Sequence, residues 1–171
     1  MKFLKFIPIF FIFFGHLSYR NLVHAEINNP KAYKALSNDG KKLSILNVEN
    51  FIKEGDKFIL NGDFDKAKDS YLDARRLAKQ LASFYSDLNK SFKGVDARIP
   101  KEMQRKGKET LRILAEANER LASLYIKDEE PEVAVPLLIE IIRILSPNSQ
   151  DAKEAYEKLI QLGFVETKYK G

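Results

Sequence analysis

The fold is decided by residues 50–74, whose sequence is NFIKEGDKFILNGDFDKAKDSYLDA. Two amphipathic helices are predicted here, one on either side of the turn Asn61-Gly62-Asp63. Gly62 supplies the left-handed backbone that ends a helix, and Asp63 is the expected cap of the next helix. Gly55 and Ala67 are small enough to let two helices approach closely, and aromatic side chains fill the remaining space. The stretch therefore predicts one complete helix–turn–helix unit.

The order of side-chain types in this unit resembles a tetratricopeptide repeat. The family's sequence of aromatic, small and turn residues is reproduced by Phe51, Gly55, Phe58, Gly62, Phe64, Ala67, Tyr71 and Ala74. Glu54 departs from the family, which prefers leucine there, and no proline follows Ala74, so the second helix is expected to run on. A looser second unit is indicated by Leu121, Ala122, Tyr125 and Ala134, although its turn lacks the glycine. The resemblance implies repeats at about 48–81 and 115–148.

The remaining pattern predicts an all-α array of antiparallel helical hairpins with a long central hairpin. After the first helix (48–61), the second helix is expected from Phe64 to about Lys90, a break at 91–96, and a third helix at 101–126 started by Pro100. Shorter helices are predicted at 131–145 and 149–162, the last as a cap over the array. A 3.6-residue stripe places Leu81, Phe84, Leu88 and Met103 inside the hairpin, with Tyr85, Phe92 and Ile99 partly exposed.

The first 25 residues have the layout of a secretory signal peptide, with lysines, an apolar run and a cleavage site at Val23-His24-Ala25. An uncleaved anchor is the alternative. Residues 26–47 read as a flexible leader, 48–163 as the helical domain and 164–171 as a tail. Blocks at 95–103, 131–147 and 155–169 are similar to small exported proteins of cyanobacteria, which implies the periplasm or thylakoid lumen.

Composition limits the chemistry of the chain. Both histidines, His16 and His24, lie in the first 25 residues, and there is no cysteine. Without that segment the charge is +2, from 26 basic and 24 acidic residues, so nucleic acid is not an expected partner. A Ser-His-Asp triad, a thiol nucleophile, a Cys/His metal site and a disulfide framework are excluded from residues 26–171. No cofactor is expected, and the protein is expected not to be an enzyme.

Carboxylates are the remaining candidates for chemistry. Asp63 and Asp65 flank the first turn, and residues 128–132 hold four more acidic groups. A carboxylate-based hydrolase or a calcium site is conceivable there. Acidic residues in the first turn of a helix also complement the helix dipole, and this structural interpretation is preferred.

Two surfaces are candidates for binding. The resemblance implies a peptide groove on the first helices of the repeats, lined by Glu49, Ile52, Asp56, Ile59, Glu119 and Ser123, which suits an extended apolar or basic peptide. The second surface is the basic tip, residues 90–112, with Lys90, Lys93, Arg98, Lys101, Arg105 and Lys108. The basic tip is expected to meet an acidic protein partner or an anionic membrane surface, and a solvated helix end without a partner is the alternative. The sequence leaves the oligomeric state open.

Overall fold

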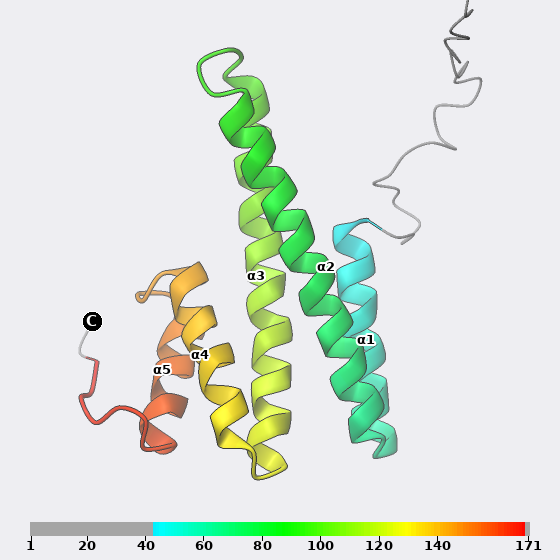
Figure 1. Cartoon of the computed structure of the whole chain (residues 1–171), viewed down its shortest axis with the longest axis vertical. Helices are drawn as coiled ribbons and strands as arrows, with labels where there is room; N and C mark the ends of the chain where they lie inside the picture. The colour runs from blue at the N-terminus through cyan, green and yellow to red at the C-terminus, as the bar shows by residue number, and fades with distance from the viewer. Residues whose placement is uncertain (1–42, 170–171) are drawn as a thin grey trace, which may run out of the picture. The chain divides into compact units, whose positions relative to one another are not determined.

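Residues 43–169 are described by the computed structural model of the chain, and they form five helices with no strand among them. The helices are α1 (Ile45–Asn61), α2 (Phe64–Ser91), α3 (Arg98–Lys127), α4 (Pro131–Leu145) and α5 (Gln150–Gln161). Each helix runs antiparallel to the one before it (Figure 1). The predicted all-α array of antiparallel hairpins is therefore confirmed. The predicted signal peptide and residues 26–42 of the predicted leader lie outside the described residues.

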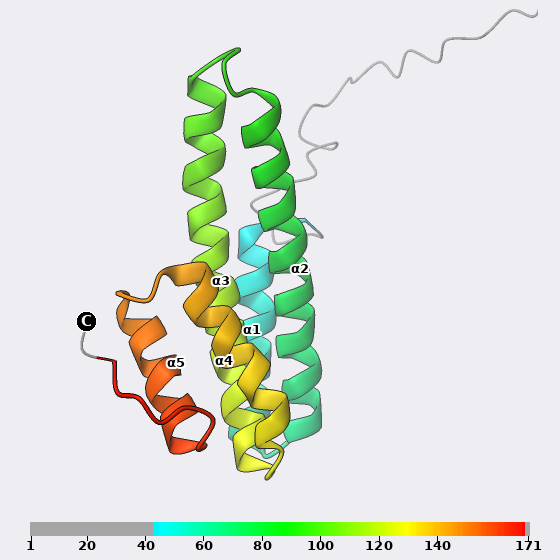
Figure 2. The same ribbon diagram turned by 60° about the vertical axis from the view of Figure 1, so that its left-hand side comes forward.

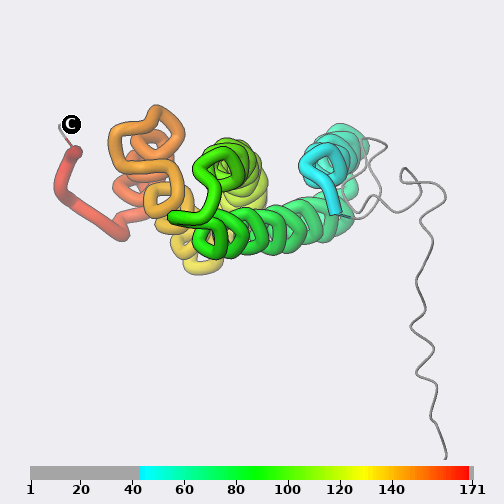
Figure 3. Tube along the Cα trace, turned by 90° about the horizontal axis from the view of Figure 1, so that it is seen from above, coloured from blue at the N-terminus to red at the C-terminus, as the bar shows by residue number. Residues whose placement is uncertain are grey.

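Successive helices pack against each other in chain order. Seen along the helix axes, α1 and α3 lie on the same side of α2 (Figure 3). Figure 2 shows α4 beside the lower half of α3, with α5 packed on α4. An ion pair of 2.7 Å between Lys158 of α5 and Glu119 of α3 brings α5 to the face that α1 and α3 form. The described residues all belong to one compact unit, Lys34–Gly171.

The helix starts differ from the prediction in three details. α3 begins at Arg98, so Pro100 is its third residue and not its start. α1 begins at Ile45 because Ser44 caps it: the Ser44 Oγ accepts the N–H of Asn47 at 3.1 Å. Residues 45–47 are therefore helical and do not belong to a flexible leader. Asp63 precedes α2 as predicted, but its carboxylate makes no capping bond and instead pairs with Lys66 at 3.3 Å.

The α2–α3 hairpin is held by two buried stripes with a period close to 3.5 residues. On α2 the stripe is Ala67, Tyr71, Ala74, Ala78, Leu81 and Tyr85, and on α3 it is Met103, Thr110, Leu114, Ala117, Leu121 and Leu124. Such spacing keeps one narrow seam in register along two helices that wind around each other. The long central hairpin is therefore a coiled-coil-like pair.

The predicted inner face of α2 was wrong in its upper half. Phe84 and Leu88, which were predicted inside, are 42% and 44% exposed, whereas Tyr85 is only 5% exposed. The predicted and the buried stripe share Leu81 and then differ by one position, because a step of three residues leads to Phe84 and a step of four leads to Tyr85. Phe92 and Ile99 are half-buried, as expected.

The central hairpin is longer than its neighbours. α2 and α3 have 28 and 30 residues, against 17 in α1 and 15 in α4. At about 1.5 Å per residue, α2 extends roughly 16 Å beyond the length of α1. Figure 1 shows this end of the hairpin standing clear of the other described helices. None of the helices in residues 43–169 combines the length and apolarity that crossing a membrane requires.

Helices α1, α3 and α5 end in the same way. Just past each helix, two consecutive N–H groups bond back to carbonyls of its last turn; the pairs are Gly62 and Asp63, Glu129 and Glu130, and Gly163 and Phe164. The first residue of each pair has a left-handed backbone, with φ of 79°, 62° and 71°. This ending recurs after 67 residues and then after 34. Glu129 thus adopts the conformation that glycine holds at the other two ends.

Candidate functional site

A chain of hydrogen-bonded side chains crosses the face formed by α1, α3 and α5. Asp56 Oδ1 on α1 accepts the hydroxyl of Tyr71 on α2 at 2.6 Å and the Nε of Arg120 on α3 at 3.1 Å. Arg120 also contacts Glu119 at 3.3 Å, and Glu119 accepts the Nζ of Lys158 on α5 at 2.7 Å. We call these five residues the crossing chain. They join four helices on one surface.

The pKa values of three residues of the crossing chain, Tyr71, Glu119 and Arg120, are shifted by their surroundings. Burial, and then the hydrogen bond to Asp56, raise the pKa of the Tyr71 hydroxyl well above its ordinary value. Burial acts to raise the pKa of Glu119, but the bond from Lys158 outweighs it and the pKa is lowered. For Arg120, burial lowers the pKa and nearby carboxylates, Asp56 first, raise it overall. Each shift favours the state in which the hydrogen bonds of the crossing chain are made, with Tyr71 protonated, Glu119 ionised and Arg120 charged.

Two hollows open beside the crossing chain. The first, of about 300 Å³, lies between α3, α4 and α5 and has an apolar floor that includes Leu138, Ile141 and Ala155. Its rim is charged: Arg112, Glu116, Glu119, Arg120, Asp151, Glu154 and Lys158. The rim therefore holds four carboxylates and three cations.

The second hollow, of about 420 Å³, lies between α1, α2 and α3 and is more apolar. It is lined by Asp56, Ile59, Leu60, Phe64, Tyr71, Arg120, Ser123, Leu124 and Lys127. Leu60, one of these lining residues, is 86% exposed. Arg120 lines both hollows. Together they form what we call the groove, with apolar floors and a polar rim that suit an extended peptide.

The structure brings together four of the six predicted groove residues. Asp56, Ile59 and Ser123 line the second hollow, and Glu119 lines the first. Ile52 was assigned wrongly, because it is 4% exposed and packs in the core between α1 and its neighbours. Glu49 is half-buried and lines neither hollow.

Sequence reasoning missed Arg120 and Lys158, which carry the cations of the crossing chain. Arg120 could have been found from the local sequence, because it follows Glu116 by four residues and lies beside the apolar positions Ala117 and Leu121. Lys158 had none, since its partner Glu119 is 39 residues away.

A second polar cluster, also missed, joins α2, α3 and α4 within the core. Glu140 is 7% exposed and accepts Arg75 at 2.9 Å, Asn118 at 3.1 Å and Lys79 at 2.8 Å. Burial acts to raise the pKa of Glu140, but the bonds from Lys79 and Arg75 outweigh it and lower the pKa. No buried side-chain nitrogen or oxygen in the described residues lacks a hydrogen-bond partner. This cluster is satisfied by its own helices, so it holds the array together and leaves no group for a ligand.

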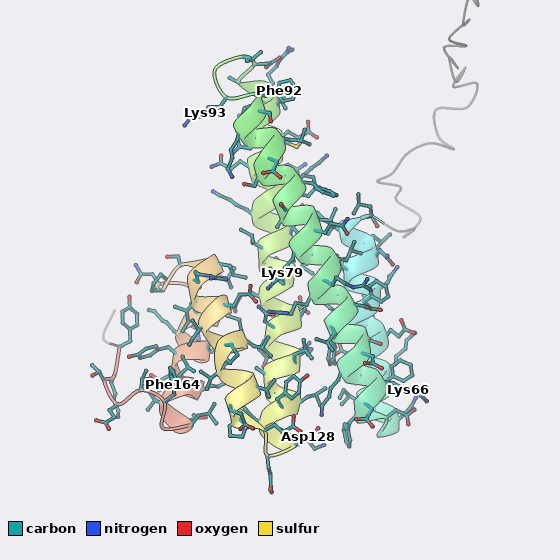
Figure 4. All side chains as sticks on the ribbon, in the orientation of Figure 1. Lys66, Lys79, Phe92, Lys93, Asp128 and Phe164 are labelled. Carbon is teal, nitrogen blue, oxygen red and sulfur yellow. The ribbon has the colours of Figure 1, made fainter. Side chains whose placement is uncertain are left out.

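The predicted basic tip surrounds the turn between α2 and α3, and its six cations are all exposed. Arg98 binds Asp96 at 2.7 Å, Lys90 lies 4.0 Å from Asp87, and Arg105 lies 3.7 Å from Glu109. Within residues 43–169, Lys93, Lys101 and Lys108 form no ion pair. Figure 4 labels Lys93 and Phe92 at this end.

The acidic residues lie at the opposite end of the hairpin, where Figure 4 labels Asp128 and Lys66. Asp128 forms an ion pair with Lys68, and Asp63 forms one with Lys66. Two of the six acidic side chains at this end are thus paired with lysines beside them. Among residues 43–169, no three carboxylate or histidine side chains converge closely enough to hold a metal ion.

The predicted packing residues lie mainly in the core. Seven of them are fully buried: Gly55, Ala67, Tyr71, Ala74, Leu121, Ala122 and Ala134. Four are half-buried, namely Phe51, Phe58, Phe64 and Tyr125, and Gly62 is exposed in its turn. Gly55 lies against the ring of Tyr71, as its predicted role in a close helix contact requires.

Comparisons with known proteins add no neighbour from which a function could be transferred. No protein-family model, no curated protein and no solved structure matches the chain significantly. The groove and the basic tip must therefore be interpreted from their own geometry.

Proposed function

We propose that the protein is an exported, noncatalytic interaction module of tetratricopeptide-like type. In this proposal it acts as an adaptor or assembly factor and binds one extended segment of a protein partner in the groove. The observation that carries the proposal is the pair of hollows that meet at Arg120, with apolar floors and fixed charges at their rims. Its localisation rests on the sequence of residues 1–25, and the periplasm or thylakoid lumen is proposed.

The repeat-like features support the tetratricopeptide part of this proposal. The ending of α3 recurs 34 residues later in α5, which is the period of that family. Ala67 and Ala134, which are also 67 residues apart, are both completely buried at equivalent positions of α2 and α4. Small residues at these points allow the close helix contact on which such a repeat depends.

The lining of the groove indicates the chemistry of the bound segment. The second hollow offers Ile59, Leu60 and Leu124 to apolar side chains. In the first hollow, Glu119 is already paired with Lys158, whereas Asp151 and Glu154 at the rim form no ion pair within residues 43–169. A segment with apolar side chains followed by a basic one complements both hollows.

Site-specific photo-crosslinking in the cell of origin tests the proposal. A photoreactive residue at Ser123, between the two hollows, should give one discrete adduct with a partner protein. The same residue at Asp69, which is exposed on α2 and lines neither hollow, should not.

A matched pair of leucine variants sharpens the test. Leu60→Asp should remove the Ser123 adduct because it puts a charge on the apolar lining of the second hollow. Leu72→Asp makes the same change at an exposed leucine of α2 outside the groove, and the adduct should persist. Equal crosslinking from Ser123 and Asp69, or an adduct that survives Leu60→Asp, would refute groove binding.

A further inference from the structure

The turn between α2 and α3 combines exposed apolar side chains with unpaired cations. Val95, in the turn itself, is 78% exposed, and Phe92 beside it is half-buried. On the flank of α2 below the turn, Phe84 and Leu88 are both more than two-fifths exposed. Apolar side chains rimmed by charge mark an interaction surface more often than a solvated end.

The charge of this surface is strongly one-sided. Residues 90–112 contain eight basic and three acidic residues, a net charge of +5. Ion pairs neutralise only part of this positive charge, since Lys93, Lys101 and Lys108 form none within residues 43–169. The complementary partner is therefore anionic.

The size of the end face of the hairpin favours a lipid surface over a protein that docks end-on. A helix is about 10–12 Å wide, so the end of a two-helix hairpin measures roughly 20 by 10 Å, or about 200 Å². A stable protein interface buries about 800 Å² on each partner. A lipid surface needs no such area, because headgroups surround every side chain that projects into them.

We propose that the basic tip docks end-on to a membrane surface that carries anionic lipid. Val95 and Phe92 enter the headgroup layer, and Lys93 and Lys101 lie among the lipid phosphates. Lys108, ten residues or about 15 Å along α3 from Arg98, is attracted to the anionic surface from further away. Binding of this kind is weak and reversible, because it relies on a few lysines and little apolar area. The proposal is independent of groove binding.

The experiment is flotation of the chain from Glu26 onward with vesicles. This chain keeps the compact unit Lys34–Gly171 and lacks the apolar run of residues 6–14, which would bind vesicles on its own account. Vesicles of phosphatidylcholine with phosphatidylglycerol should float the protein at about 0.1 M salt, and much less at about 1 M, where screening shortens to roughly 3 Å. Phosphatidylcholine alone should not float it.

Two triple variants with the same charge change locate the binding surface. Lys93→Gln, Lys101→Gln and Lys108→Gln together should weaken partitioning at least about 25-fold, from roughly fivefold for each of Lys93 and Lys101 and a smaller factor for Lys108. The control variant combines Lys53→Gln, Lys57→Gln and Lys168→Gln, which remove three exposed lysines away from the tip. Its partitioning into anionic vesicles should change by less than about threefold. Far-UV circular dichroism checks that both variants remain helical.

A separate variant tests the apolar contact. Val95→Asp should lower the binding that remains at high salt, because it removes the side chain expected to enter the headgroups. The proposal is overturned if anionic vesicles fail to float the protein, if both triple variants lose equal affinity, or if the tip variant binds like the unaltered chain. A protein partner lost from the tip variant, without vesicle binding, would overturn it in favour of a protein interface.

Discussion

Gly55 and Gly107 both lie inside helices, yet replacing each by alanine should change stability in opposite directions. A Cβ at Gly55 would lie 2.7 Å from Cδ1 and 2.8 Å from Cζ of Tyr71. At Gly107 the nearest atom would be the Cβ of Tyr85 at 3.7 Å, an ordinary contact. Removing a glycine from a helix interior stabilises by about 0.5–1 kcal/mol where space permits. Gly107→Ala should therefore stabilise the protein by about that amount.

At Gly55 the same gain is outweighed by the tyrosine ring, which has little freedom to move. Tyr71 is 1% exposed, and its hydroxyl is held by Asp56 at 2.6 Å. Overpacking a core costs about 1–3 kcal/mol, and weakening a hydrogen bond to a charged group adds about 1.5–3 kcal/mol where it is lost. After the helix gain is subtracted, Gly55→Ala should destabilise by about 1–3 kcal/mol. Gly55→Leu should be worse.

Urea and thermal unfolding, followed by far-UV circular dichroism, measure both changes. One kcal/mol corresponds to roughly 2–4 °C in Tm for a chain of this size. Repeating Gly55→Ala in a Tyr71→Leu background isolates the cause, because the penalty should then vanish or reverse. Gly55→Ala that stabilises like Gly107→Ala, or a penalty that persists without the Tyr71 ring, would refute this account of the helix contact.

Three further predictions concern the turn, the buried carboxylate and the N-terminus. Glu129→Gly should stabilise by about 0.5–1 kcal/mol, because Glu129 has φ 62°, whereas Glu130→Gly, which removes the same charge, should not; urea midpoints compare them. Because the folded pKa of Glu140 is lowered, its contribution is present above the ordinary glutamate pKa and is lost as pH falls through the folded value. Unfolding measured from pH 7 downward should show a steeper loss in the unaltered protein than in Glu140→Gln, and parallel curves would contradict this. The mature N-terminus should be Glu26, which intact mass of the native protein decides; a product that keeps residues 1–25 would indicate an anchored protein.

Helix boundaries were predictable because local residues determine them. Gly62 ends α1, Pro131 starts α4 and Gly163 follows α5, and each acts through its own backbone. The early start of α1 was missed although Ser44, a favoured N-cap residue, stands between Leu43 and the apolar pair Ile45 and Leu46. The glycine-free turn at Glu129 was expected to be degenerate, yet the backbone path there matches the other two ends.

Side-chain facing was less predictable, because neighbouring positions of one helix can both carry an apolar side chain. From Leu81 the prediction continued to Phe84, whereas the structure buries Tyr85, one position further on. Both choices keep a helical spacing of three to four residues. The position of α3 decides between them, and Tyr85 lies against Gly107 of that helix.

The polar networks were the least predictable feature, because they join residues far apart in the chain. Arg75 reaches Asn118 and Glu140, 43 and 65 residues away, and Arg120 reaches Asp56 at a separation of 64. Glu140 lies in a largely apolar run of α4, which indicated that its carboxylate needs a partner but not which residue this is. The identity of that partner depends on the order in which the helices pack, which local sequence does not contain.

The two proposed surfaces occupy different levels of one continuous helix. Arg98 at the start of α3 and Arg120 in the groove are 22 residues apart, or about 33 Å along the helix. On the proposed end-on docking, lipid headgroups at the tip lie several Debye lengths from the groove, since screening acts over about 10 Å at 0.1 M salt. The carboxylates at the groove rim are then not repelled by the anionic lipid that holds the tip. Because α3 is unbroken between the two levels, the hairpin acts as a spacer, and a segment bound in the groove would be held at a fixed height above the membrane.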